Sequence, residues 1–181
     1  MMADLAAPRR GRVWKFGDDI DTDRLAPYDS MAQPWPDRRE SVLRERPEFA
    51  ATCRPGDIVV AGRNFGCGSS REPAVDNLRL LGVSCVLALS FARIYFRNAV
   101  STGFPNLVCL GITEACEDGD ELEVHIVDGI VRNLTRDAEL AAAPLDATML
   151  SILEAGGLMA LLRRQRTPSV HRRIDLREDE R

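Results

Sequence analysis

The chain has 181 residues, of which 45% are hydrophobic, so it is long enough to form one domain with a substantial core. Its formal net charge of -4 gives no basic surface of the kind that binds nucleic acid. No apolar run reaches the length of a membrane-spanning helix, and residues 1–10 lack the apolar segment of a signal peptide. We therefore expect a cytoplasmic protein that binds neither nucleic acid nor a membrane.

The N-terminal part predicts a strand, an acidic turn and a long connection. Residues 1–10 form an expected N-terminal extension, and residues 11–16 alternate between polar and apolar side chains, as a strand does. An acidic turn follows, with Asp18, Asp19, Asp21 and Asp23. It lacks the glycine and the terminal glutamate of an EF-hand calcium loop, so the residues alone indicate a solvated turn. Residues 24–48 are rich in proline and charge, and they predict a functional connection with one helix over residues 37–46.

The next stretch joins a strand to a helix through a glycine-rich turn. Residues 57–62 are a short β-branched run that predicts a buried strand, and apolar side chains at helical spacing predict a helix that ends before Gly82. Residues 64–72 between them read Asn-Phe-Gly-Cys-Gly-Ser-Ser-Arg-Glu, and we call residues 64–71 the glycine loop. Glycines let successive N-H groups converge on one point, and the helix adds the positive end of its dipole. The glycine loop therefore predicts an anion-binding site.

The position of Pro73 indicates where this helix starts. Proline has no backbone N-H, so it fits best where the helix needs no donor, which makes Ser70 the expected N-cap. Ser69 then stays in the turn with its hydroxyl available for chemistry. The alternative is an ordinary glycine turn with two capping serines and a solvated Arg71.

The middle of the chain predicts parallel strands. Residues 83–89 and 107–110 read as buried strands on either side of a helix over residues 91–102, an order typical of a right-handed crossover. Ligands of such sheets bind beyond the carboxyl ends of the strands, where the glycine loop and Arg93 would lie. Arg93 would there either help to hold a carboxylate or fix the neighbouring loop.

The last third predicts a hairpin and a helix. Residues 121–131 alternate in polarity around a turn at Asp128-Gly129, as a hairpin does. Residues 146–164 predict a helix that is bent or interrupted at Gly156-Gly157, and residues 165–181 predict a charged, mobile tail.

The cysteines and histidines predict no metal site within this chain. The five cysteines include no Cys-x-x-Cys pair, and only two histidines accompany them. Cys85 and Cys109 lie in apolar runs and are expected in the core, whereas His125 is expected on a solvated strand face. Cys67 lies in the glycine loop beside a helix N-terminus, where a thiolate would be stabilised, although we do not favour it as the nucleophile.

Four motifs occur in order along the chain. They are the Asp-Thr-Asp of residues 21–23, the stretch from residue 56 to residue 72, the Ser-Phe-Ala-Arg-Ile-Tyr-Phe-Arg-Asn-Ala of residues 90–99, and the Leu-Glu-Ala-Gly-Gly-Leu of residues 153–158. Together they resemble the small subunit of 3-isopropylmalate dehydratase, which corresponds to the swivel domain of the aconitase superfamily. The resemblance implies an α/β fold, namely a single three-layer β/β/α swivel domain over residues 11–164. A mainly parallel sheet, a smaller hairpin layer and outer helices are expected.

The resemblance also implies a chemistry. Such a chain is the small subunit of a two-subunit hydro-lyase that isomerises a hydroxy di- or tricarboxylate by dehydration and rehydration. The chain itself is expected to bind no cofactor, and a 4Fe-4S cluster is expected on its partner, the large subunit. Ser69 matches the catalytic serine base, and Asp23 matches an active-site residue supported by Asp21 and Thr22. The residues expected to bind the substrate are Arg71, Ser70, Gly68, Arg93, Arg24 and Tyr28.

Residues 24–31 depart from the relatives in the segment that is expected to select the substrate. Within residues 24–37, Arg24 is the only positive residue. The other side chains of this stretch predict an apolar or small group on the substrate. The apolar residues are Leu25, Ala26, Tyr28, Met31 and Trp35. Isopropylmalate or a similar branched malate is therefore favoured over citrate or homocitrate. Open alternatives are the same chemistry on dimethylmalate, methylcitrate or homoaconitate, a non-catalytic anion-binding swivel module, and a stand-alone hydrolase using Ser69 or Cys67.

Overall fold

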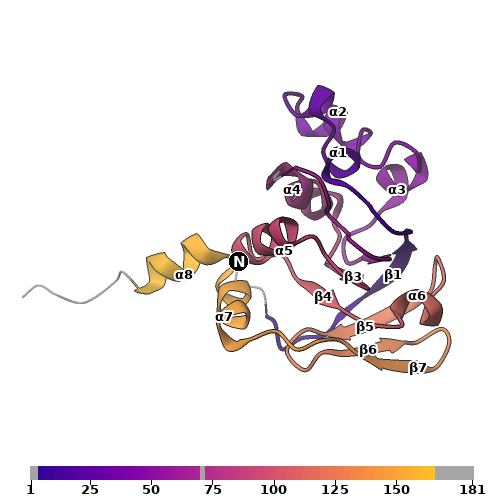
Figure 1. Ribbon diagram of the computed structural model, residues 1–181, viewed down its shortest axis with the longest axis vertical. Coiled ribbons are helices and arrows are strands. Elements are labelled where there is room, and N and C mark those ends of the chain that lie inside the picture. Colours follow the sequence, from indigo (N-terminus) through magenta and orange to yellow (C-terminus); the bar gives the residue numbers. More distant parts are fainter. Residues whose placement is uncertain (1–3, 70–71, 166–181) are drawn as a thin grey trace, which may run out of the picture.

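The computed structural model describes residues 4–69 and 72–165, and the seven strands in this part form one sheet in the order β4-β3-β2-β1-β5-β6-β7 (Figure 1). The strands are β1 (Arg9–Lys15), β2 (Ile58–Ala61), β3 (Cys85–Ala88), β4 (Asn106–Val108), β5 (Glu121–His125), β6 (Ile130–Asn133) and β7 (Ala138–Ala141). The helices are α1 (Thr22–Leu25), the 3-10 helix η1 (Tyr28–Ser30), α2 (Trp35–Arg39), α3 (Pro47–Thr52), α4 (Glu72–Leu81), α5 (Arg93–Ser101), α6 (Ile112–Ala115), α7 (Ala147–Ala155) and α8 (Leu158–Gln165).

Strand β1 divides the sheet into a parallel and an antiparallel half. Its first residues pair antiparallel with β5, as in the pair Arg9 and Val124, whereas its last residues pair parallel with β2, as in Val13 and Ile58. The sheet curls at this strand, so that β5, β6 and β7 form a layer beneath the parallel strands (Figure 1). One core cluster fills the space between the layers and contains residues of both halves, such as Val60 and Leu122.

The other face of the parallel half is covered by helices. Successive side chains of a strand point to opposite faces of the sheet, and in β2 Ile58 and Val60 belong to the cluster between the sheet layers. Val59 and Ala61 belong instead to a cluster shared with α3, α4 and α5. Both faces are therefore buried, which explains the continuous apolar run of this strand. The expected three-layer β/β/α architecture is confirmed, with one curled sheet supplying both β layers.

The long connection after α1 differs from its prediction. The expected helix over residues 37–46 is wrong, because α2 ends at Arg39 and the backbone of Leu43 adopts a left-handed conformation with φ 53°. The N-H of Leu43 donates to the carbonyl oxygen of Arg24 at 2.8 Å, and its side chain is fully buried. Tertiary packing therefore outweighs helix propensity here, and a separate helix, α3, follows.

Other elements extend or complete the predicted ones. Strand β1 begins at Arg9, within the expected N-terminal extension, because Arg10 pairs with Glu121 of β5 at 2.8 Å. Strand β7 and helices α1 and α6 were not predicted from the sequence. The interruption at Gly156-Gly157 is confirmed, since these glycines have φ 80° and 120° and separate α7 from α8. Residues 166–181 of the expected tail lie outside the described residues.

Helix α8 projects away from the body of the domain (Figure 1). Among the described residues, no helix has the length and apolar composition needed to cross a membrane.

Candidate functional site

Three segments that are far apart in the sequence meet at the carboxyl ends of β1, β2 and β3. The segment after β1 contains the acidic turn, the segment after β2 is the glycine loop, and the segment after β3 leads into α5. Isolated parallel bridges join Asp21 to Cys67 and Phe65 to Phe91. Residues 21–23, the described part of the glycine loop (residues 64–69) and the start of residues 90–99 therefore form one site, at the edge where parallel sheets bind ligands.

The acidic turn holds the glycine loop from one side. The N-H of Gly66 donates to the carbonyl oxygen of Ile20 at 2.7 Å, and the N-H of Thr22 donates to that of Cys67 at 2.8 Å. The hydroxyl of Thr22 then donates to the carbonyl oxygen of Ser69 at 2.9 Å. Thr22 is only 1% exposed, so these contacts are shielded from water. Thr22 therefore fixes the glycine loop with one backbone and one side-chain hydrogen bond.

The turn before α5 holds the loop from the other side. The N-H of Phe65 donates to the carbonyl oxygen of Ser90 at 3.0 Å, and the N-H of Ala92 donates to that of Phe65 at 2.9 Å. The hydroxyl of Ser90 accepts from the N-H of Asn64 at 2.9 Å. These bonds fix the start of α5, and therefore the position of Arg93, relative to the glycine loop.

Gly66 is required by both its conformation and its surroundings. Its φ is 78°, and a Cβ atom at this position would lie 2.1 Å from Cγ of Tyr95. Tyr95 is 2% exposed and packs edge-on against Phe65, with their ring centroids 5.3 Å apart. The loop therefore runs directly over an aromatic cluster, an approach that only glycine allows.

Ser69 is exposed at the end of the described part of the glycine loop. Ser70 and Arg71 lie outside the described residues, and so do the expected N-cap at Ser70 and the expected clamp by Arg71. Helix α4 begins at Glu72, which makes Pro73 its second residue, where no intrahelical donor is needed. At its other end, Gly82 has φ 100°, and Val83 donates to Leu78 as in a Schellman motif, so the predicted C-cap is confirmed.

A hollow of about 320 Å³ opens beside the glycine loop. It is lined by Gly66, Gly68, Ala92, Arg93, Ile94 and Arg97. Arg93 and Arg97 are exposed, and within residues 4–69 and 72–165 neither guanidinium forms a hydrogen bond or an ion pair. The neighbouring loop is held by Ser90 and not by Arg93, so of its two expected roles the carboxylate-binding one fits the geometry. Arg97 was not singled out from the sequence, although it follows Arg93 by one helical turn.

Asp23 and Arg24 lie in α1 beside a second hollow of about 240 Å³, which Arg44 also lines. The carboxylate of Asp21 caps α1 by accepting from the N-H of Arg24 at 2.8 Å. Asp23 is exposed in the first turn, and the guanidinium of Arg24 donates to the carboxylate of Glu45 at 2.6 Å. Arg44 forms a two-pronged pair with Asp29, at 2.9 and 2.8 Å. Acidic partners therefore compensate the positive charge of both arginines.

The expected apolar wall after Asp23 is wrong in part. Leu25 and Ala26 are fully buried in the core below α1, where they cannot touch a substrate. Tyr28, in η1, is 79% exposed and does not line the hollow beside the glycine loop. Sequence reasoning also missed Asn77, whose buried amide donates to the carbonyl oxygen of Leu25 at 2.9 Å and ties α1 to α4. An asparagine on the apolar face of a predicted helix was the available signal.

The surroundings of Cys67 do not stabilise a thiolate. Partial burial raises the pKa of this thiol, and the nearby carboxylates of Asp21 and Asp19 raise it further. The expected stabilisation by the helix N-terminus is therefore wrong. Cys85 and Cys109 are fully buried, as predicted, and burial raises the pKa of Cys85 to about 12.

His125 lies on the more exposed face of β5, opposite the buried Leu122 and Val124, as expected, and it is partly exposed. Its Nε2 atom lies 3.1 Å from the carboxylate of Glu123. In the part of the chain that the structure describes, no group of three or more histidine, cysteine, aspartate or glutamate side chains is placed to hold a metal ion.

Comparisons with known proteins agree with this geometry. Residues 37–109 match the family described as the aconitase C-terminal domain. The chain is 49% identical to the 3-isopropylmalate dehydratase small subunit 1 of Methanopyrus kandleri, over 86% of this chain and 93% of that protein. It is also 49% identical to the methanogen homoaconitase small subunit of Methanothermobacter thermautotrophicus, over 83% and 88%.

A solved structure shares the fold as well. The crystal structure of 3-isopropylmalate dehydratase from Methanocaldococcus jannaschii superposes with a TM-score of 0.81 at 32% identity, over 87% of this chain and 95% of that one. With nearly half of its residues shared over almost the full length of these relatives, the chain belongs to the family of 3-isopropylmalate dehydratase small subunits, which are the small subunits of two-subunit hydro-lyases.

Proposed function

We propose that this chain supplies the base and part of the carboxylate clamp to an isopropylmalate-type isomerase, whose large subunit carries a 4Fe-4S cluster. The observation that carries this proposal is the convergence of three segments on the glycine loop, which contains the exposed Ser69. The loop shares a hollow with Arg93, whose guanidinium has no partner among the described residues. The substrate is a hydroxy dicarboxylate, which loses water and regains it across the same double bond with the hydroxyl moved. We expect the enzyme to act in the cytoplasm.

Ser69 acts as the base in this proposal. Its hydroxyl, in an alkoxide-like form, takes the proton from the carbon next to a substrate carboxylate. Such a form needs a strongly positive environment, and the N-terminus of α4 together with Arg93 and Arg97 supplies positive charge on the side of the hollow. A 4Fe-4S cluster on the large subunit would supply the Lewis acid that the poor leaving group, hydroxide, requires.

Arginines hold the substrate in this proposal. A guanidinium presents two parallel N-H groups, which match the two oxygens of a carboxylate, so Arg71 and Arg93 are suited to clamp the two carboxylates of the substrate. Gly68 and Ser70 add backbone N-H groups of the glycine loop, and Gly68 lines the same hollow as Arg93. Asp23 lies in α1, which the bonds of Thr22 attach to the loop.

A branched malate is the favoured substrate, because the positive charge of Arg24 is compensated by Glu45. A second candidate is a tricarboxylate of the homoaconitate type. Two observations favour this second candidate: the homoaconitase relative is 49% identical, and Arg97 has no partner among the described residues.

Dependence on the large subunit tests the proposed function. The purified chain alone is expected to be colourless and inactive, because it lacks the Lewis acid. Adding a cluster-bearing large subunit, itself inactive alone, is expected to give dehydratase activity on isopropylmalate. Turnover of a malate-type substrate by this chain alone, in metal-free buffer, would contradict the two-subunit proposal.

A further inference from the structure

One face of α5, exposed at Ile94 and partly exposed at Asn98 and Ser101, runs from the candidate active site to helix α8. Ile94, Asn98 and Ser101 follow one another at helical spacing and therefore share this face. Ile94 is 52% exposed and lines the hollow that contains Arg93 and Arg97. Asn98 and Ser101 line the next hollow along the helix, toward α8.

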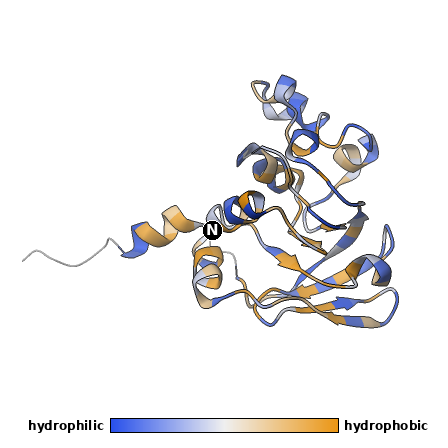
Figure 2. Ribbon diagram, viewed as in Figure 1, coloured by the Kyte–Doolittle hydropathy of each residue, from blue (hydrophilic) through white to orange (hydrophobic). Residues whose placement is uncertain are grey.

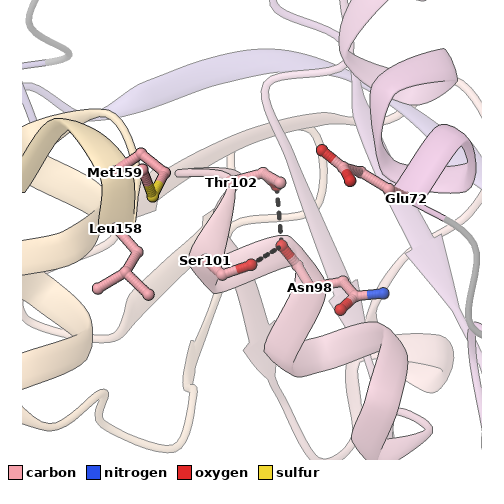
Figure 3. A pocket seen from close by; sticks show the side chains of 6 residues that line it. All are labelled: Glu72, Asn98, Ser101, Thr102, Leu158 and Met159. Atoms are coloured by element: carbon pink, nitrogen blue, oxygen red, sulfur yellow. Dashed lines mark hydrogen bonds between the residues drawn. The ribbon is translucent and has the colours of Figure 1, made fainter.

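The hollow lined by Asn98 and Ser101 has a volume of about 400 Å³ and lies between α4, α5 and α8 (Figure 3). The hydroxyls of Ser101 and Thr102 both donate to the carbonyl oxygen of Asn98, at 2.9 Å each, so their donor groups are already used within α5. Leu158 and Met159 of α8 line the other side. An apolar edge therefore remains available on the side of α8.

Helix α8 is amphipathic and has no buried residue. Leu158, Met159 and Leu162 are 38%, 63% and 41% exposed, and its end is basic, with Arg163 and Arg164. Figure 2 shows the apolar start and the hydrophilic end of the helix, which projects from the domain. A helix of eight residues gains most of its stability from packing of its apolar side, and among the described elements α8 packs mainly against α7 and α5.

We propose that the exposed face of α5 from Ile94 to Ser101, together with Leu158, Met159 and Leu162 of α8, is the surface on which an apolar patch of the large subunit docks. This inference rests on the proposed function. A partner that completes the candidate active site must cover the hollow lined by Ile94, Arg93 and Arg97, and a separate hollow follows along the same face of α5 toward α8.

A second copy of this chain fits the same surface less well. A two-fold contact there would bring Arg93 and Arg97 of one copy close to the same arginines of the other, and in the described part of the chain neither arginine has an acidic partner. It would also close the hollow against substrate. The large subunit is therefore the occupant to which the geometry points.

Matched charge insertions test this surface. Leu162→Glu places a charge on α8, and Leu134→Glu is the control, because Leu134 is 40% exposed and lies in the turn between β6 and β7. Both variants are assayed with the large subunit by calorimetric titration, and alone by melting temperature and light scattering. We expect Leu162→Glu to raise the Kd for the large subunit by about 30-fold or more, the loss typical of a central contact residue, while Leu134→Glu leaves it unchanged. Saturating concentrations of the variant are expected to restore kcat.

The outcomes separate this inference from the proposed function. If the wild-type chain assembles and is active but Leu162→Glu binds equally well, the docking surface is wrong and the function stands. If the wild-type chain neither assembles nor gains activity, the proposed function fails first. A change of self-association alone would assign the surface to a second copy and overturn the inference. Leu162→Ala, which introduces no charge and is expected to raise Kd by about 5- to 10-fold, keeps the test decisive if glutamate lowers the melting temperature.

Discussion

The hydroxyl of Thr22 donates a hydrogen bond to the backbone carbonyl oxygen of Ser69 at 2.9 Å. The residue proposed as the base is therefore held by α1, which precedes it by 47 residues, as well as by its own loop. Thr22 is almost completely buried, so water does not replace this bond when the hydroxyl is removed.

Replacing Thr22 by valine is expected to lower kcat of the assembled enzyme by about 10- to 100-fold, because a misplaced catalytic group loses alignment with the reacting atom. Thr22→Ser keeps the hydroxyl and is the control, expected to stay within several-fold of the wild type. Steady-state kinetics of both variants with the large subunit check this. Equal kcat for Thr22→Val and wild type would show that the bond does not position Ser69.

Replacing Ser69 by alanine removes the proposed base but leaves the backbone of the loop. Turnover of the assembled enzyme is expected to fall by about two to four orders of magnitude, the range typical of general-base loss, while KM stays within several-fold. Ser151→Ala, at an exposed position of α7, is a suitable control. Unchanged turnover in Ser69→Ala would make Ser69 a turn residue only.

Gly66 and Gly119 both have a positive φ, so the loss of stability on replacement by alanine can be compared between the two positions. Their φ values are 78° and 86°, but a Cβ at Gly66 meets the ring of Tyr95, whereas nothing lies within 4 Å at Gly119. Gly119→Ala is expected to cost about 1–2 kcal/mol of unfolding free energy from backbone strain. Gly66→Ala adds overpacking of about 1–3 kcal/mol and is expected to lose more stability in total. Urea unfolding of both variants measures the difference, and equal losses would contradict the close approach to Tyr95.

The sequence predicted correctly those strands and helices that are determined by residues within or next to them. The β-branched run of β2, the proline at the second position of α4 and the glycines at both ends of that helix all act within a few residues. The three-layer arrangement and the roles of the site residues came from the resemblance to a family, because periodicity alone indicates only an α/β fold.

The features that the sequence did not predict depend on contacts between distant residues. Leu43 leaves the helical conformation because its N-H bonds to Arg24 and its side chain fills the core. Leu25 and Ala26 were predicted to form an apolar wall of the substrate site, but the structure places both in the core. The sequence signal for this contact was the buried Asn77, which donates to the carbonyl oxygen of Leu25. The pairing of Arg24 with Glu45 likewise joins residues that no local pattern connects.

The raised pKa of Cys67 predicts a poorly reactive thiol. Partial burial and the carboxylates of Asp21 and Asp19 favour the protonated form, so the reactive thiolate is scarce at neutral pH. The rate of alkylation by iodoacetamide in the isolated chain is expected to keep rising above about pH 8.5, where an ordinary thiol is half ionised. The other four cysteines are buried, so mass spectrometry can assign the modification to Cys67. Cys67→Ser is expected to retain activity, and a rate that levels off near neutral pH would restore the thiolate hypothesis.

Substrate choice depends on where an unpaired positive charge lies. A third carboxylate needs a cation, because burying it without one costs several kcal/mol. Arg24 is paired with Glu45, so Arg24→Ala is expected to leave the preference for a branched malate over homoaconitate or citrate unchanged. Ratios of kcat/KM for these substrates, measured with the assembled wild type and variant, test this. A tricarboxylate preference that disappears in Arg24→Ala would mean that Arg24 leaves Glu45 for the substrate. A tricarboxylate preference that survives Arg24→Ala but disappears in Arg97→Gln would place the third carboxylate on α5, where Arg97 has no partner among the described residues.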